Sequence, residues 1–114
     1  MLEAAADRVR VIHVHGYNLT PGWVEDYPAE VMSWSHNQSQ PTLAEVAKAG
    51  RYVPMGGLDE LGSLYWALSK VTANVMASRR ETNDKLIIAP GCTVHSDTPP
   101  SILHTLVAAA RTPL

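Results

Sequence analysis

Apolar residues follow two alternating patterns along this chain. Short apolar runs rich in β-branched residues cover residues 8–15, 30–34, 51–59 and 85–91, which predicts four β-strands. Between and after these runs, apolar residues recur three and four positions apart, as they do on one face of a helix. Strands that alternate with helices form a parallel sheet with helical crossovers, so the pattern predicts an α/β fold.

Capping signals locate the first helix, and apolar spacing locates the second. Thr42, with Glu45 three positions later, predicts a capping box, and Gly50 is a suitable end for this short helix. A second helix is predicted to extend to about Arg80. Its buried stripe is expected to consist of Leu61, Leu64, Leu68, Val71 and Val75.

The last helix and the loop after the first strand complete the predicted elements. Thr98 is expected to be the N-cap of the last helix, with Pro99 in its first position. The inner face of this helix is expected to contain Ile102, Leu103, Leu106, Val107 and Ala110. The apolar run 85–91 is expected to be buried on both faces. The first loop has room for one helical turn with Thr20 as its N-cap.

Composition restricts the class of protein. A length of 114 residues favours a single domain, and the net charge of −2 gives no basic surface for nucleic acid or an anionic membrane. We therefore expect neither as a partner. No apolar stretch is long enough to predict a membrane span. The single cysteine excludes an internal disulfide and fits a reducing, cytoplasmic setting.

Polar and glycine-rich residues gather where each predicted strand ends. They occupy residues 13–15, 34–36, 56–59 and 91–95. Parallel α/β sheets and barrels carry their chemistry at the carboxyl ends of the strands. His13 and His15 point to the same side of the first strand because side chains alternate. Two such histidines are more often core or edge groups than metal ligands, so the pattern alone leaves both interpretations open.

Several segments resemble the C-terminal half of the uroporphyrinogen decarboxylase superfamily. They are "VIHVHG", "DYPAEVMSW", "GRYVPMGGLDE" and "LIIAPGCTVHSDTPPSILHTLVAAAR", in the family's order and spacing. The family fold is a TIM (β/α)8 barrel, and the resemblance implies that residues 1–114 are its units five to eight. The intact protein is then expected to be an enzyme, and this chain alone to be inactive.

The resemblance implies one of two chemistries. Decarboxylases of porphyrin biosynthesis in this superfamily use no metal, and they carry Gly-His-Gly where this chain has Gly91, Cys92 and Thr93. Zinc-dependent methyltransferases of the superfamily move a methyl group between a corrinoid and a thiol. Their metal ligands are His-x-Cys after strand five and Cys after strand eight. Carried over, the ligands are His13, His15 and Cys92, with His15 in place of the family's cysteine.

A zinc ion accepts imidazole and thiolate together and keeps a fourth position for a ligand. The implied cofactor is therefore zinc, with a thiol, a corrinoid or a porphyrinogen as the small-molecule substrate. Trp34, His36 and Gly57 (with Gly56 beside it) are candidates for substrate binding. Trp34 is equally suited to the core.

Two aspartates have further candidate roles. Asp59 is a further candidate for substrate binding or a helix cap, and Asp59 and Asp97 are candidate acceptors for the second ring nitrogens of the histidines.

Half of a barrel leaves two unpaired strand edges and an uncovered inner face. We therefore expect the chain to pair with the N-terminal half of the barrel or to associate with itself. A third interpretation remains open, in which the chain is a non-catalytic half-barrel that serves as an assembly module.

Overall fold

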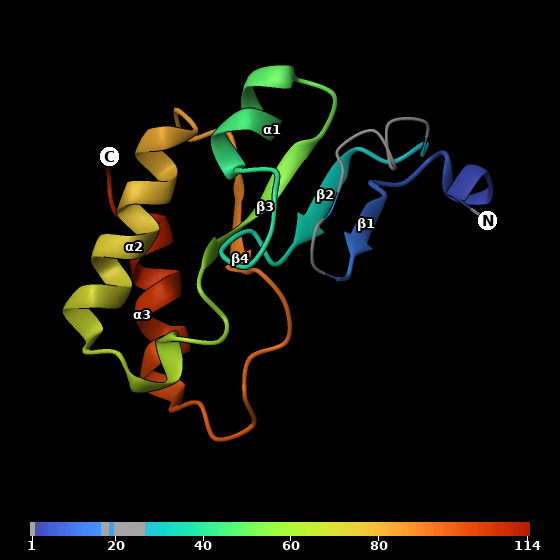
Figure 1. Cartoon of the computed structure of the whole chain (residues 1–114). Helices are drawn as coiled ribbons and strands as arrows, with labels where there is room; N and C mark the ends of the chain where they lie inside the picture. Colours follow the sequence, from blue (N-terminus) through green and yellow to red (C-terminus); the bar gives the residue numbers. More distant parts are fainter. Residues whose placement is uncertain (1, 17–18, 20–26) are drawn as a thin grey trace.

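The four predicted strands pair into one parallel sheet in the order β1-β2-β3-β4. The protein was analysed as a computed structural model, which describes residues 2–16, 19 and 27–114 (Figure 1). The elements are η1 (Leu2–Ala5), β1 (Val11–Val14), β2 (Val31–Trp34), α1 (Leu43–Ala49), β3 (Val53–Leu58), η3 (Ser63–Tyr65), α2 (Leu68–Glu81), β4 (Ile87–Pro90) and α3 (Pro100–Arg111). The α/β fold with parallel strands is thus confirmed. The helical turn expected at Thr20 lies outside the described residues.

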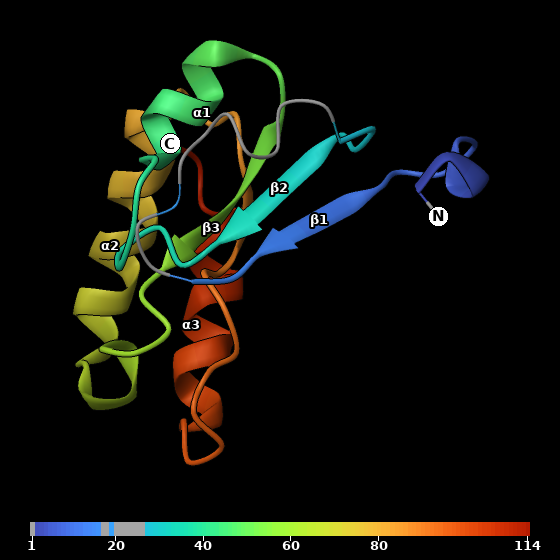
Figure 2. The same cartoon turned by 45° about the vertical axis from the view of Figure 1, so that its right-hand side comes forward.

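Helices cover one face of the sheet. Figures 1 and 2 show α2 and α3 side by side, with α1 against the same face. One core cluster forms where Met32 and Trp34 of β2 meet Leu43 and Val46 of α1. A second cluster joins Leu58, Val71, Val75, Ile102, Leu106 and Ala109 from β3, α2 and α3. In a parallel sheet with sequential strand order and helices on one face, all strand-to-helix loops lie at the carboxyl end of the strands.

The other face of the sheet is partly open. Val11, Val53 and Ile87 are 49%, 43% and 41% exposed, and Val11 and Val53 lie in one row of the sheet with Val31 between them. Val31 itself is buried, so the exposed apolar residues lie on β1, β3 and β4. The expectation that residues 85–91 are buried on both faces is wrong at Ile87, because no helix in the described part of the chain covers this side of β4.

The strands are shorter than predicted because pairing with the neighbouring strands covers only part of each apolar run. The ladder of β1 with β2 begins at Val11 opposite Val31, so residues 8–10 lie outside it. Val9 is 74% exposed. Apolar patterning marks which residues suit a strand, whereas a strand's ends are set by where a neighbouring strand is available.

The first helix is formed as predicted. Thr42 accepts a hydrogen bond from the backbone N–H of Glu45, and the Glu45 carboxylate accepts one from the N–H of Thr42. Gly50 ends the helix in the left-handed conformation, with φ of 73°. The capping box and the C-terminal glycine are both confirmed.

The second helix begins later than its apolar stripe predicts. The Asp59 carboxylate accepts hydrogen bonds from the N–H groups of Leu61 and Gly62, which favours a turn over a helix there. A short 3-10 helix follows, and the backbone is extended at Trp66 and Ala67 before α2 starts. Leu61 is consequently 59% exposed rather than part of the inner stripe.

The last helix has a different cap from the predicted one. Pro100 restricts the preceding Pro99 to an extended conformation, with φ of −57° and ψ of 137°, so Pro99 is the N-cap. Thr98 makes no capping bond, and its hydroxyl oxygen is buried without a partner. On the inner face, Ile102 and Leu106 are buried together with Ala109, whereas Leu103 and Val107 are exposed.

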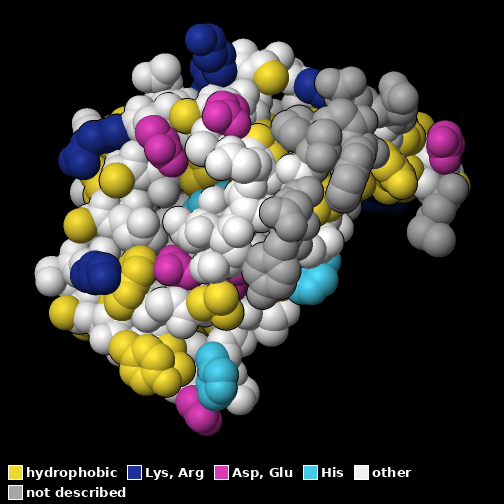
Figure 3. Space-filling view, in the orientation of Figure 1, with side chains coloured by type: hydrophobic (Ala, Val, Ile, Leu, Met, Phe, Trp, Pro, Cys, Tyr) yellow, Lys and Arg dark blue, Asp and Glu magenta, His cyan; other side chains and the backbone are white. Residues whose placement is uncertain are grey.

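Charged side chains of both signs are interspersed over the described part of the surface in Figure 3. None of the helices in the described part of the chain is both long and apolar enough to cross a membrane.

An ion pair joins β1 and β2 at the end of the sheet remote from the histidines. Arg10 donates to the Glu30 carboxylate from its guanidinium, at 2.8 Å, and from its backbone N–H. The side-chain hydrogen bonds from Arg10, and then the backbone bond, lower the pKa of Glu30 from 4.5 to about 2. A folded-state pKa below the unfolded value stabilises the fold at pH above about 4.5, and this contribution is lost as the pH falls toward 2.

We expect an NMR titration of Glu30 to give a midpoint near 2 in the folded chain. Arg10→Met should return it toward the ordinary glutamate value of 4.5, because the hydrogen bonds from the guanidinium are removed. Arg8→Met is the matched control, since Arg8 is exposed and lies beside Asp7 instead. A midpoint that does not move in Arg10→Met would contradict this account.

Candidate metal centre

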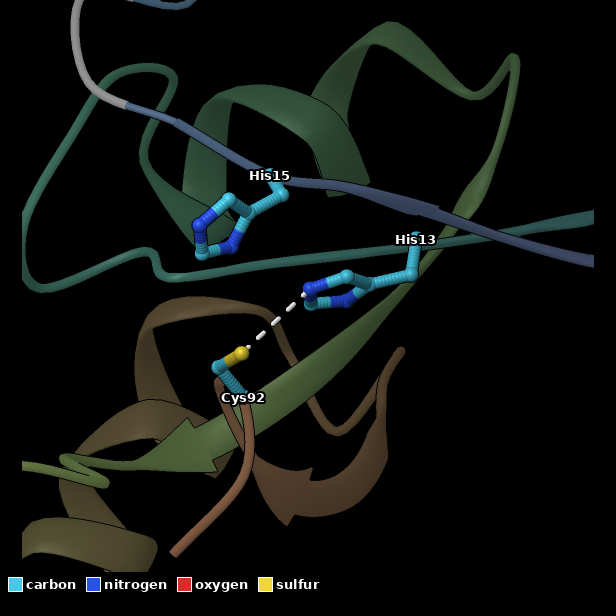
Figure 4. A group of neighbouring side chains, drawn as sticks. All are labelled: His13, His15 and Cys92. Atoms are coloured by element: carbon cyan, nitrogen blue, oxygen red, sulfur yellow. Dashed lines mark hydrogen bonds between the residues drawn. The ribbon is translucent and has the colours of Figure 1, made fainter.

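Three side chains predicted to hold a metal converge in the structure. His13 lies in β1, His15 directly follows it, and Cys92 follows β4 (Figure 4). One ligating atom from each lies within 4.8 Å of the other two, and Cys92 Sγ is 3.5 Å from His13 Nε2. Ligands at bond lengths of 2.0–2.3 Å around a tetrahedral ion are about 3.3–3.8 Å apart. A contraction of about 1 Å would bring the trio to that spacing, so these residues could hold a metal ion.

The trio joins the two edge strands of the sheet. Strands in a sheet lie about 4.8 Å apart, so three spacings separate β1 from β4 by roughly 14 Å along a flat sheet. A sulfur–nitrogen distance of 3.5 Å therefore requires the carboxyl end of the sheet and the segment after β4 to curve toward the face that bears the histidines. The long histidine side chains span the remaining distance.

Ser33 orients His13. Its Oγ lies 3.0 Å from His13 Nδ1, and the two residues are direct partners in the β1–β2 ladder. If Nδ1 carries the proton and donates it to Ser33, Nε2 is left as a lone-pair donor on the side of Cys92. This is the arrangement of metal-binding histidines, whose second nitrogen donates to a fixed acceptor.

The aspartates proposed for this orienting role lie elsewhere. Asp59 accepts hydrogen bonds in the turn after β3, whereas the N-caps of η3 and α2 are Gly62 and Ala67, so the expected helix cap at Asp59 is not formed. Its role in substrate binding stays a prediction. Asp97 is exposed and lies 3.7 Å from His95. Sequence reasoning missed Ser33. Strand alternation gives the face of β2 on which Ser33 lies, but only the register of β1 against β2 shows that it lies opposite His13.

The metal trio is accessible from outside. His13 and His15 are exposed, and Cys92 is partly buried. Beside them is a cavity of about 110 Å³. It is lined by His15, Gly16, Ser35, Gln38, Glu60, Leu61 and Cys92. A metal ion held by the trio would thus have room for a further ligand.

Glu60 is a second residue that sequence reasoning missed. Its side chain is 2% exposed, and its Oε1 accepts a hydrogen bond of 2.5 Å from Ser35 Oγ. Its Oε2 is buried and has no hydrogen-bond partner. The available signal was an acidic residue directly after Asp59 at a strand end, but acidic residues are common in such loops.

Trp34, a candidate for substrate binding, occupies the core. It is completely buried, and its Nε1 donates to the carbonyl oxygen of Pro41 at 2.8 Å. This placement matches the alternative that Trp34 fills the core. Its role in substrate binding stays a prediction.

His36 packs against the two glycines of β3. Its Nε2 accepts a hydrogen bond from the N–H of Gly57 at 2.9 Å, so the proton of the neutral ring is on Nδ1. Burial lowers the pKa of His36, against the opposing charges of Glu60 and Asp59, which favours the neutral ring. A Cβ added to Gly56 would lie 2.6 Å from His36 Cδ2. The group that approaches this backbone in the structure is therefore His36. A ligand contact at His36 or Gly57 remains a prediction.

No family model matches this chain, and no curated protein is significantly similar to it. What stands is the parallel four-strand α/β fold and a His2Cys cluster that could hold a metal ion. The resemblance to the uroporphyrinogen decarboxylase superfamily rests on the sequence motifs alone.

Proposed function

We propose that this chain is part of a zinc-dependent methyltransferase of the uroporphyrinogen decarboxylase superfamily, which transfers a methyl group between a corrinoid and a thiol. The observation that carries the proposal is the convergence of His13, His15 and Cys92 from opposite edges of the sheet. Two imidazoles and one thiolate form a ligand set that zinc accepts, with a fourth position left for substrate.

The proposed chemistry needs a thiol in its nucleophilic form. Bound zinc would favour the thiolate of an incoming thiol, which is the form that attacks a methyl group. The chain's own residues supply the setting. Ser33 fixes the ring of His13, and the exposed histidines leave the position open to a substrate. The cavity beside His15 and Cys92 provides room for a small ligand.

The partners follow from the sheet. We propose that β1 and β4 pair with strands from an N-terminal half-barrel, because both are edge strands among the described residues. Such a half would also cover Val11, Val53 and Ile87. This closure would complete a (β/α)8 barrel with the metal trio at its carboxyl-end mouth.

The proposal is tested by adding a thiol to the cobalt-loaded chain. Cobalt(II) replaces zinc in such sites and has visible and near-ultraviolet absorption that reports its ligands. We expect 2-mercaptoethanol to increase the sulfur-to-cobalt absorption band and to release about one proton per thiol bound, since metals bind the deprotonated form.

The matched control is 2-(methylthio)ethanol, which has no thiol proton to release and should leave the band unchanged. A spectrum that does not respond to the thiol would contradict the methyltransferase proposal. Turnover of uroporphyrinogen by the metal-free chain would instead favour the decarboxylase, although we expect none because the family's anchoring residues belong to the other half-barrel.

A further inference from the structure

Glu60 is a buried carboxylate with an unused oxygen. The side chain is 98% buried, Ser35 donates to Oε1, and Oε2 has no hydrogen-bond partner. Buried carboxylates are normally hydrogen-bonded or paired with a cation, because desolvation of an ionised group is costly. An orphaned carboxylate oxygen in a native structure points to a missing partner.

The described part of the chain provides no salt-bridge partner for Glu60. The charged and titratable side chains around it include Asp59, its sequence neighbour, and His36, whose pKa the Glu60 charge raises against the larger effect of burial. His15 and Cys92 line the same cavity as Glu60. A neutral His36 offers no compensating charge. The carboxylate is therefore electrostatically unpaired, and a cation that enters beside it gains a strong hydrogen bond.

Glu60 lines the same small cavity as two of the metal candidates. His15, Cys92 and Glu60 are all on its wall. The Oε2 atom also lies close to Gly91, since a Cβ added there would be 2.7 Å from it. Gly91 directly precedes Cys92, so the unpaired oxygen of Glu60 lies beside the backbone that carries the thiol. The cavity is small, at about 110 Å³, which favours a ligand with few non-hydrogen atoms.

We propose that Glu60 binds the ammonium group of a small aminothiol whose sulfur binds at the His13, His15 and Cys92 site. This inference rests on the proposed function and names the class of its thiol substrate. A carboxylate oxygen accepts hydrogen bonds and an ammonium group donates three, so the two groups complement each other. A linker of two or three carbons between sulfur and nitrogen fits the size of the cavity.

The test compares two thiols that differ only at the far end. The cobalt-loaded chain is titrated with 2-aminoethanethiol and with 2-mercaptoethanol, and each dissociation constant is expressed per thiolate because the two thiols differ in acidity. We expect the aminothiol to bind about 10- to 100-fold more tightly, as a charge-assisted hydrogen bond provides. Glu60→Gln should abolish this preference while keeping the hydrogen bond from Ser35.

Glu81→Gln is the matched control, because it makes the same substitution at the end of α2, away from the cavity, and should retain the preference. Cobalt affinity should be unchanged in Glu60→Gln. A loss of cobalt affinity would overturn the proposal by making Glu60 a metal ligand, and so would a preference that survives in Glu60→Gln. If Glu60→Gln does not fold, equal binding of the two thiols by the unchanged chain overturns it. A thiol band that never forms overturns the proposed function, and this inference with it.

Discussion

The chain purified from a zinc-supplied preparation is expected to retain one zinc ion, and Cys92→Ala is expected to lose it. Cys92 supplies the only thiolate that this sequence offers. The Cys92 Sγ atom lies 3.5 Å from His13 Nε2. Loss of a residue that only orients a ligand lowers metal affinity about 10- to 100-fold, so loss of the ligand itself should cost more than about 100-fold. Metal content after dialysis and titration with a competing chelator measure this effect.

His13→Ala should have a comparable effect on metal affinity. His104→Ala is the matched control because His104 is exposed on α3, away from the metal trio. Circular dichroism of each variant separates metal loss from unfolding. Metal content that is the same in Cys92→Ala as in the unchanged chain would rule out the metal centre.

The second large effect concerns association. At micromolar concentration the chain is expected to sediment as a dimer or larger species and to bind a hydrophobic dye. Val11, Val53 and Ile87 expose apolar surface on one face of the sheet, and β1 and β4 are its edges. Apolar faces and unpaired parallel edges recruit other chains. Val53→Lys with Ile87→Lys should shift the population toward monomer and reduce dye binding several-fold.

Tyr65→Lys is the control for a general effect of added charge. Tyr65 is 85% exposed and lies in η3, outside the sheet. It should leave association unchanged. A sharp monomeric boundary for the unchanged chain, with cooperative unfolding and no dye binding, would mean that the exposed face is tolerated and would remove the argument for a missing half.

The sequence predicted the elements that depend on local signals. The Thr42–Glu45 capping box and the Gly50 terminus involve residues within one helix, and both are confirmed. The metal trio was predicted from strand alternation and family resemblance, and the structure brings its atoms together. The capping box and the Gly50 terminus depend on residues close together in the sequence, and the metal trio depends on the parallel order of the strands.

Other features depended on interactions that a one-dimensional pattern does not contain. The role of Ser33 depends on its register opposite His13, 20 residues away. Glu60 meets Ser35 across 25 residues. The predicted helical stripe from Leu61 is interrupted because the Asp59 carboxylate accepts hydrogen bonds from the backbone N–H groups of Leu61 and Gly62, which competes with helix formation. Such contacts arise only after strands and loops are positioned in space.

The position of the metal trio has a consequence for how the domain would unfold. His13 and Cys92 are 79 residues apart in the chain, and between them lie β2, α1, β3, α2 and β4. An ion bound there would be a removable cross-link that encloses most of the chain but not α3, and closing a loop of this length restricts the unfolded chain. Opening the first strand would then require either release of the ion or disruption of the last strand as well. With metal bound, the amides of all four strands should exchange at the same slow rate. After a chelator removes the metal, the amides of β1 should exchange faster than those of the other strands.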